Sequence, residues 1–186
     1  MFVGGAGKRM GGVAKGLLRV PGGSETIIER LLGVCRCAAP TATVCLVGSA
    51  TPYSALGLPA LSDDPAQIGP LGGLRSLLLR AVDDGCSVAL ALACDLPFLD
   101  ERMVSLLLAP LQGAARVPFS EGRLQPLSAA YAPKATLSAV DRSLALGKYS
   151  LMHVLDELAS DVERVEFDAA GAQTLRDWDT PEDLLR

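Results

Sequence analysis

Residues 71–94 read LGGLRSLLLRAVDDGCSVALALAC and join two patterns in one short segment. From Leu71 to Val82, leucines recur every three or four residues with arginines on the opposite face, which predicts an amphipathic helix. Ser87 to Cys94 is a continuous apolar run, which is typical of a strand buried on both faces. A helix followed by such a strand indicates an α/β domain.

The same alternation extends upstream. Residues 24–37 predict a helix that begins with Ser24 and has glutamates in its first turn. The apolar run at residues 42–47 predicts a second buried strand, which reaches the strand at residues 87–94 through the helix at residues 71–82. A strand, a helix and a strand in this order imply that the two strands pair in parallel.

Further elements follow downstream. The pattern predicts, in order, a helix over residues 101–111, strands over 115–118 and 126–131, helices over 134–146 and 151–158, a strand over 162–167 and a helix that begins at Asp179-Thr180-Pro181. A cap residue followed by proline is a typical helix start. Alternating strands and helices predict a three-layer α/β domain.

Composition narrows the class of partner. The 186 residues are 49% hydrophobic, which suits a single domain with its own core. The chain has 17 Lys and Arg against 21 Asp and Glu, a net charge of −4, which disfavours nucleic acid and anionic membrane surfaces as partners. No apolar run reaches the ~18 residues that a membrane span needs, and no secretory leader precedes the glycines. These features predict a cytoplasmic protein.

The five cysteines do not suggest a disulfide framework or a zinc site. Their number is odd, and three of them lie within apolar runs. Cys35 and Cys37 lack the C-x-x-C spacing, and the only histidine, His153, lies far away and within an apolar helical pattern. We expect His153 to be structural.

A glycine-rich loop near the start carries the strongest chemical signal. Residues 3–15 hold five glycines and three cations, including two of the four lysines of the chain. Glycines let backbone amides approach a phosphate chain, which the cations neutralise. The alternative interpretation of this segment is a flexible N-terminal tail. The spacing fits neither the P-loop nor the dinucleotide-binding glycine motif. Only three residues precede Gly4, so either the first strand is very short or the start is truncated.

This loop resembles the glycine-rich signature of the molybdenum cofactor nucleotidyltransferases, and most closely that of the MobA-type guanylyltransferases. It runs from Phe2 to Lys15, with Gly7 in place of the usual serine. Further stretches match short motifs of that family in the same order: residues 63–73, 93–98, 125–127, 147–150 and 179–184. The resemblance implies one Rossmann-like nucleotidyltransferase domain over residues 1–186, with a central mixed, mainly parallel sheet.

The resemblance also assigns roles to individual residues. It implies Lys15, Asp95 and Arg9 for catalysis, Phe2, Val3, Gly4, Gly5, Lys15, Asp63 and Asp95 for nucleotide binding, Lys148, Gln125 and Asp179 for the pterin side, and Asp95 as a ligand of Mg²⁺.

Physical chemistry agrees with these roles. Lys15 is a compact cation suited to bridging phosphates, and Arg9 offers a forked donor to the same groups. Asp95 follows an apolar run, which places its carboxylate at the carboxyl end of a strand, and Mg²⁺ prefers oxygen ligands. The alternative roles are a solvated surface lysine for Lys15, a surface ion pair for Arg9 and a turn cap for Asp95. By resemblance, Asp63 or its neighbour Asp64 would help to hold the nucleoside, and the alternative is that both are solvated.

Several positions depart from the family pattern. Asp177 and Asp179 replace asparagines, and an ionised carboxylate can only accept hydrogen bonds. The family asparagine after the second strand is absent from residues 46–49, and Lys148 replaces an arginine, keeping the charge without the fork.

The implied activity is transfer of GMP from GTP to molybdopterin with release of pyrophosphate, and molybdenum cofactor assembly proteins are the implied protein partners. Gly4-Gly5 favours the guanylyl branch by resemblance, and small residues leave room for a purine. Two alternatives stay open: a cytidylyltransferase that uses CTP on the same pterin, and a non-catalytic nucleotide-binding module of cofactor assembly.

Overall fold

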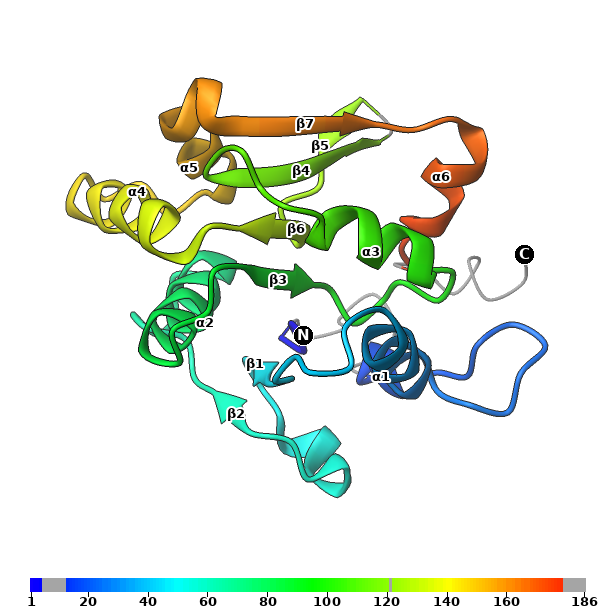
Figure 1. Ribbon diagram of the computed structural model, residues 1–186. Coiled ribbons are helices and arrows are strands. Elements are labelled where there is room, and N and C mark those ends of the chain that lie inside the picture. Colours follow the sequence, from blue (N-terminus) through cyan, green and yellow to red (C-terminus); the bar gives the residue numbers. More distant parts are fainter. Residues whose placement is uncertain (5–12, 121, 179–186) are drawn as a thin grey trace.

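The computed structural model describes residues 1–4, 13–120 and 122–178 of the chain (Figure 1). Its strands are β1 (Leu46–Val47), β2 (Ala60–Leu61), β3 (Ala89–Leu92), β4 (Ala115–Ser120), β5 (Arg123–Leu124), β6 (Ser128–Tyr131) and β7 (Val162–Glu166). Its α-helices are α1 (Ile27–Ala38), α2 (Pro70–Asp83), α3 (Glu101–Leu108), α4 (Pro133–Ala145), α5 (Leu151–Leu158) and α6 (Ala169–Thr174). Short 3₁₀ helices are η2 (Lys15–Leu17), η3 (Thr51–Leu56) and η4 (Ala159–Asp161).

The first residues of the chain lie in the middle of the sheet. The amide of Phe2 donates to the carbonyl of Leu92 at 2.7 Å, and the amide of Val3 donates to the carbonyl of Val47 at 2.9 Å. Phe2 thereby makes parallel bridges to both Val47 and Ala93. The predicted direct pairing of the strands at residues 42–47 and 87–94 is therefore wrong. Those strands run in the same direction, but the N-terminal segment separates them.

The sheet is mixed. β1 pairs with β2 and β4 pairs with β7 in parallel, whereas β6 pairs antiparallel with both β3 and β4, and β4 pairs antiparallel with β5. The expectation of a mainly parallel sheet is thus not supported. The physical reason is that a short connection joins β4 to β5 and can join only antiparallel neighbours, and the chain then continues through β6 along the same edge of β4, against its direction.

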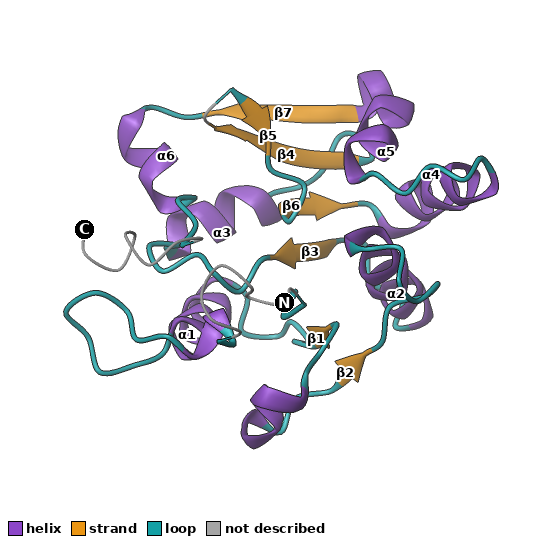
Figure 2. Ribbon diagram, turned by 180° about the vertical axis from the view of Figure 1, so that it is seen from behind, coloured by secondary structure: helices purple, strands orange, loops and turns teal. Residues whose placement is uncertain are grey.

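Helices cover both faces of the sheet. One core contains Val47, Ala91 and Tyr131 together with residues of α2, α4 and α5. The other contains Leu46, Leu92 and Ala130 together with residues of α1, α3 and the region of α6. Alternate residues of each strand therefore enter opposite cores, as strand geometry requires. The two helix groups gather on opposite sides in both ribbon views (Figures 1 and 2), so the predicted three-layer α/β arrangement is confirmed.

Most helix predictions agree with the structure within a few residues. α5 spans residues 151–158 as predicted, and the hydroxyl of Ser150 accepts the amide of Met152 at its start. α1 begins later than Ser24 because Thr26 and Glu29 form a capping box. The helix predicted for residues 101–111 ends at Leu108.

The remaining differences are local. The strand predicted for residues 42–47 forms only at its last two residues. The elements β2, β5, α6, η2, η3 and η4 were not predicted. The helix predicted from Asp179 onward lies outside the described residues. Among the helices that the structure describes, none is long and apolar enough to cross a membrane.

Candidate active site

An ion pair joins two loops that lie 80 residues apart in the sequence. Lys15 begins η2, and Asp95 lies just beyond the end of β3. The Nζ atom of Lys15 lies 3.0 Å from Oδ2 of Asp95, and the two side chains are 18% and 19% exposed. The carboxyl ends of parallel strands are where open α/β sheets bind their ligands. The structure therefore brings two of the three predicted catalytic residues together, while Arg9 lies outside the described residues.

The loop of Asp95 is held by the C-terminal segment. The carbonyl of Asp95 accepts the amide of Trp178 at 3.0 Å. The ring of Trp178 is buried and packs edge-on against Phe98, with 6.2 Å between the ring centroids. The hydrogen bond and the ring packing hold the backbone of Asp95, and they place the only tryptophan of the chain beside the site.

Asp63 and Asp64 have different surroundings. Asp64 is exposed and forms an ion pair with Arg75, which also bonds Asp141 at 2.8 Å. Asp63 is partly buried beside the first turns of α2, where a β-carbon added to Gly73 would lie 3.0 Å from its Oδ1 and 3.0 Å from the ring of Phe2. Asp63 therefore lies next to the N-terminal segment, whereas the carboxylate of Asp64 already has a cation.

The structure describes the predicted nucleotide loop at its two ends, residues 2–4 and 13–15. Phe2 and Val3 are buried, Gly4 is exposed, and Gly5 lies outside the described residues. A β-carbon on Gly48, which has a φ of +100°, would lie 3.1 Å from both Cα and N of Gly4. Only glycine is tolerated at such a close backbone approach with a positive φ. The two chain segments that leave the central strands therefore pass in direct backbone contact.

A cleft of about 460 Å³ adjoins Asp95. It is lined by residues of three regions, the β3 end, the hairpin around β5 and the first turn of α5, together with the C-terminal segment. The lining includes Asp95, Arg123, Gln125, Met152 and Asp177. Gln125, predicted for the pterin side, thus lines the same cleft as Asp95.

The other predicted pterin-side residues are placed differently. Lys148 is exposed in the loop before α5 and does not line the cleft, although the first residues of α5 do. Asp179 lies outside the described residues. Arg123, which the sequence analysis did not single out, lines the cleft, with Nη2 3.9 Å from Oδ2 of Asp177. The nearest signal in the sequence is the short motif at residues 125–127, which begins two residues after Arg123.

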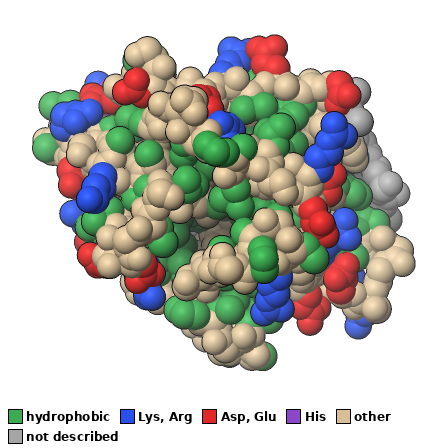
Figure 3. Space-filling model, in the orientation of Figure 1, with side chains coloured by type: hydrophobic (Ala, Val, Ile, Leu, Met, Phe, Trp, Pro, Cys, Tyr) green, Lys and Arg blue, Asp and Glu red, His purple; other side chains and the backbone are tan. Residues whose placement is uncertain are grey.

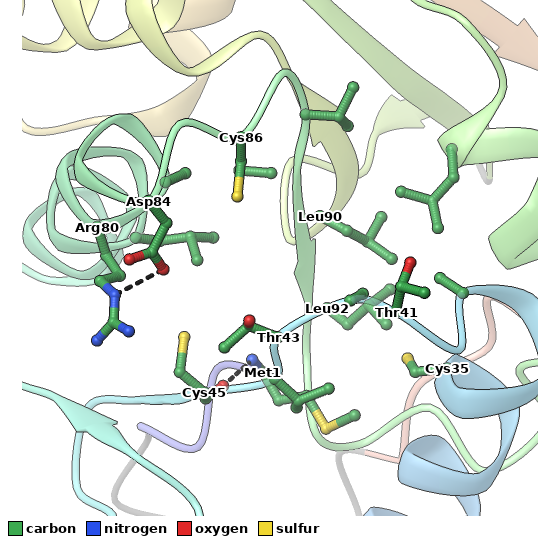
Figure 4. Close-up of a pocket in the computed structure, with 18 of the residues that line it drawn as sticks. Met1, Cys35, Thr41, Thr43, Cys45, Arg80, Asp84, Cys86, Leu90 and Leu92 are labelled. Carbon is green, nitrogen blue, oxygen red and sulfur yellow. Dashed lines mark hydrogen bonds and ion pairs between the residues drawn. The ribbon is translucent and has the colours of Figure 1, made fainter.

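A second cavity, of about 370 Å³, lies at the opposite edge of the sheet, where β1 and β3 begin (Figure 4). Its lining combines Cys35, Cys45 and Cys86 with apolar side chains, and Arg80 and Asp84 form a 2.7 Å ion pair at one side. The face shown in Figure 3 is hollowed near its centre, and acidic and basic side chains are interspersed around it. No predicted site residue lines this cavity.

Two features mark the carboxyl edge instead: a cation and a carboxylate in contact, and an adjoining cleft that holds a further arginine. A cation and a carboxylate beside a cleft suit a reaction on phosphates that is driven by positioning and charge. Nucleotidyl transfer is a reaction of this class.

Comparison with known proteins agrees with this class. The chain belongs to the MobA-like NTP transferase family, whose domain profile matches residues 2–163. It is 30% identical over 169 residues to a protein of Mycobacterium tuberculosis named "Probable molybdenum cofactor guanylyltransferase", covering 89% of this chain and 81% of that protein. The molybdenum cofactor guanylyltransferase of Acidiphilium cryptum is 30% identical over 145 residues, covering 77% and 70%.

A solved structure supports the fold. The molybdopterin-guanine dinucleotide biosynthesis protein A of Archaeoglobus fulgidus superimposes with a TM-score of 0.73 at 18% identity, covering 99% of this chain and 93% of that one. The likeness extends over all the layers of the sheet and helices described above, so the predicted nucleotidyltransferase fold is confirmed.

Proposed function

We propose that this chain transfers GMP from GTP to molybdopterin and releases pyrophosphate, forming the guanine dinucleotide of the cofactor. The observation that carries the proposal is the Lys15–Asp95 pair beside the cleft, in a chain whose relatives are named guanylyltransferases. Family membership alone leaves the nucleotide and the acceptor open, whereas the site offers groups for both.

The reaction exchanges one phosphorus–oxygen bond for another. A phosphate oxygen of molybdopterin forms a bond to the α-phosphorus of GTP. The bond from that phosphorus to the oxygen that bridges to the β-phosphate breaks, and pyrophosphate leaves with the bonding electrons. No side chain has to form a covalent intermediate, so the protein contributes by positioning both phosphates and stabilising charge.

The triphosphate would lie at the carboxyl edge of the sheet. The ammonium of Lys15 would bind phosphate oxygens and neutralise charge as pyrophosphate departs, with Arg9 as a second cation. On the nucleoside side, Asp63 and the segment of residues 2–5 would hold the base and sugar. Gln125 and Lys148, with Asp179, would serve the pterin side, and the structure adds Arg123 as a cation within the cleft itself.

The donor set of the site fits a nucleotide-bound metal ion. Among the described residues, no cluster of three or more His, Cys, Asp or Glu side chains could hold a metal ion alone. Mg²⁺ usually binds one or two carboxylates and takes its other ligands from water and phosphate oxygens. We therefore assign Asp95 as the protein ligand of Mg²⁺ that arrives with GTP. When bound, the ion would neutralise the phosphates and polarise the α-phosphorus.

The test is pyrophosphate release by the purified protein with Mg²⁺, molybdopterin and each of GTP, CTP and ATP. We expect release with GTP, less with CTP and little with ATP. Omission of molybdopterin is the control for nucleotide hydrolysis. Faster release with CTP would assign the protein to the cytidylyl branch. Nucleotide binding without release would identify the non-catalytic module and contradict the proposal.

A further inference from the structure

A buried tyrosine links the two loops that carry Lys15 and Asp95. Tyr53 lies in η3, the helix that follows β1, and is 2% exposed. Its hydroxyl oxygen accepts the amide of Gly16 at 3.2 Å and lies 3.9 Å from Sγ of Cys94. Gly16 directly follows Lys15, and Cys94 directly precedes Asp95. One hydroxyl group therefore touches the immediate neighbours of both site residues.

The backbone of Gly16 is tightly packed against this hydroxyl. A β-carbon added to Gly16 would lie 3.0 Å from both Cε1 and Oη of Tyr53 and 3.3 Å from Cβ of Cys94. These separations are tighter than ordinary contacts, so the backbone of Gly16 fits between the tyrosine ring and the cysteine only because it has no side chain. The distance between the two loops is consequently set by the ring of Tyr53.

The link is uncharged. Burial, followed by the neighbouring Cys94, raises the pKa of Tyr53 above its ordinary value, so its hydroxyl keeps its proton. Tyr53 can thus accept the amide of Gly16 and still offer its own proton to the sulfur, without adding a charge that would compete for Lys15 or Asp95.

We propose that Tyr53 is a positioning residue for nucleotidyl transfer, which sets the separation of Lys15 and Asp95 through Gly16 and Cys94. This role rests on the proposed function. A buried amide that loses its acceptor must move or open to find another. Without the hydroxyl, η2 would therefore shift away from β3, and Lys15 would lose its fixed distance from the metal ligand Asp95.

The test is Tyr53→Phe, which removes one oxygen and keeps the ring. We expect kcat to fall roughly tenfold to a hundredfold, because displacements on the order of 1 Å have effects of that size on positioned reactants. KM for GTP should change by less than about threefold, because ground-state binding uses many other contacts. In the same variant, the Gly16 amide should exchange with solvent at least about tenfold faster, measured by NMR on protein labelled with ¹⁵N-glycine.

The matched control is Thr136→Val. Thr136 is fully buried in α4, and its hydroxyl donates to the carbonyl of Ala114 at 2.9 Å, so this variant also loses one buried hydroxyl bond to the backbone. It should lose thermal stability without changing kcat or the exchange of Gly16. Gly16→Ala changes the other partner of this contact by adding a β-carbon against the ring of Tyr53, and we expect it to lower kcat in the same way.

The outcomes separate this role from the proposed function. Normal kcat in Tyr53→Phe, or an unchanged exchange rate of Gly16, would overturn the role of Tyr53. If wild-type protein transfers no nucleotide, the proposed function fails instead. The exchange rate of the Gly16 amide then tests Tyr53 by itself: faster exchange in Tyr53→Phe but not in Thr136→Val supports the link, and equal rates overturn it.

Discussion

The Lys15–Asp95 and Arg116–Glu163 ion pairs are similar in length and burial but differ in their surroundings. Nζ of Lys15 lies 3.0 Å from Asp95, and Nη2 of Arg116 lies 2.6 Å from Glu163. The side chains are 18% and 19% exposed in the first pair and 11% and 27% in the second. Both pairs join distant parts of the chain, so length and burial alone do not tell which one serves a reaction.

The backbone around each pair makes the difference. The guanidinium of Arg116 also donates to the carbonyls at the end of α3 and just after it: Leu106, Leu107, Ala109 and Pro110. The carboxylate of Glu163 also accepts the amides of Gln112 and Gly113. Among the described residues, no backbone amide donates to the carboxylate of Asp95, which opens on the cleft instead. A pair completed by backbone groups holds the fold, and a pair facing a cleft can exchange partners with a ligand.

Asp95→Asn should give the largest effect on turnover. An amide keeps the shape of the side chain but loses the charge that holds the metal, so we expect pyrophosphate release to fall at least about a hundredfold. The midpoint of thermal unfolding should stay close to that of wild type. Glu163→Gln is the matched control, because it makes the same chemical change in the other pair. Near-normal release by Asp95→Asn would mean that this carboxylate only completes the turn.

Lys15→Ala should lower the rate more than it lowers GTP affinity. The ammonium acts on charge that builds as pyrophosphate leaves, so its loss affects the transition state more than the bound ground state. We expect a single-turnover rate on the order of tenfold to a hundredfold lower. Lys15→Arg should restore only part of it, because a planar fork cannot occupy the place of a compact ammonium. An unchanged rate in Lys15→Ala would remove Lys15 from the site.

Arg116→Met should show the reverse pattern. It leaves the Glu163 carboxylate without its cation and the end of α3 without its donor, which we expect to lower the free energy of unfolding by about 2–3 kcal/mol. Turnover at a temperature where the variant is folded should match wild type. Arg80→Ala is the control, since its pair with Asp84 is exposed and such pairs contribute little. A catalytic defect in folded Arg116→Met would break the distinction between the two pairs.

The smallest expected effect is a pH dependence at Glu163. Burial raises the pKa of this carboxyl, but the amides of Gln112 and Gly113 together with Arg116 outweigh it, and the net shift is downward. The stabilisation is therefore complete above the ordinary glutamate value of about 4.3 and is lost as the pH falls through the lower folded-state pKa. Thermal unfolding of wild type and Glu163→Gln between neutral and acidic pH should show a difference in midpoint that narrows on acidification. A constant difference would contradict this linkage.

Local signals predicted single elements well. The leucine spacing of α2 and the apolar pattern of α5 specify helices through contacts within a few residues, and the structure places both where the sequence indicated. The short motifs indicated the family, which the comparison confirms. Arg123 was missed because it lies just outside the motif at residues 125–127, and Tyr53 because nothing local distinguishes a buried tyrosine from any other.

The sequence by itself determined the alternation of helices and strands, the α/β class and the nucleotidyltransferase family, because periodicity, capping and short motifs act over neighbouring residues. Only the tertiary structure decided that residues 1–3 lie between β1 and β3, that β6 runs against its neighbours, and that Lys15 meets Asp95. Strand order and contacts between distant side chains depend on hydrogen bonds and packing between residues far apart in the chain. No local sequence pattern specifies which of the many possible partners forms these contacts.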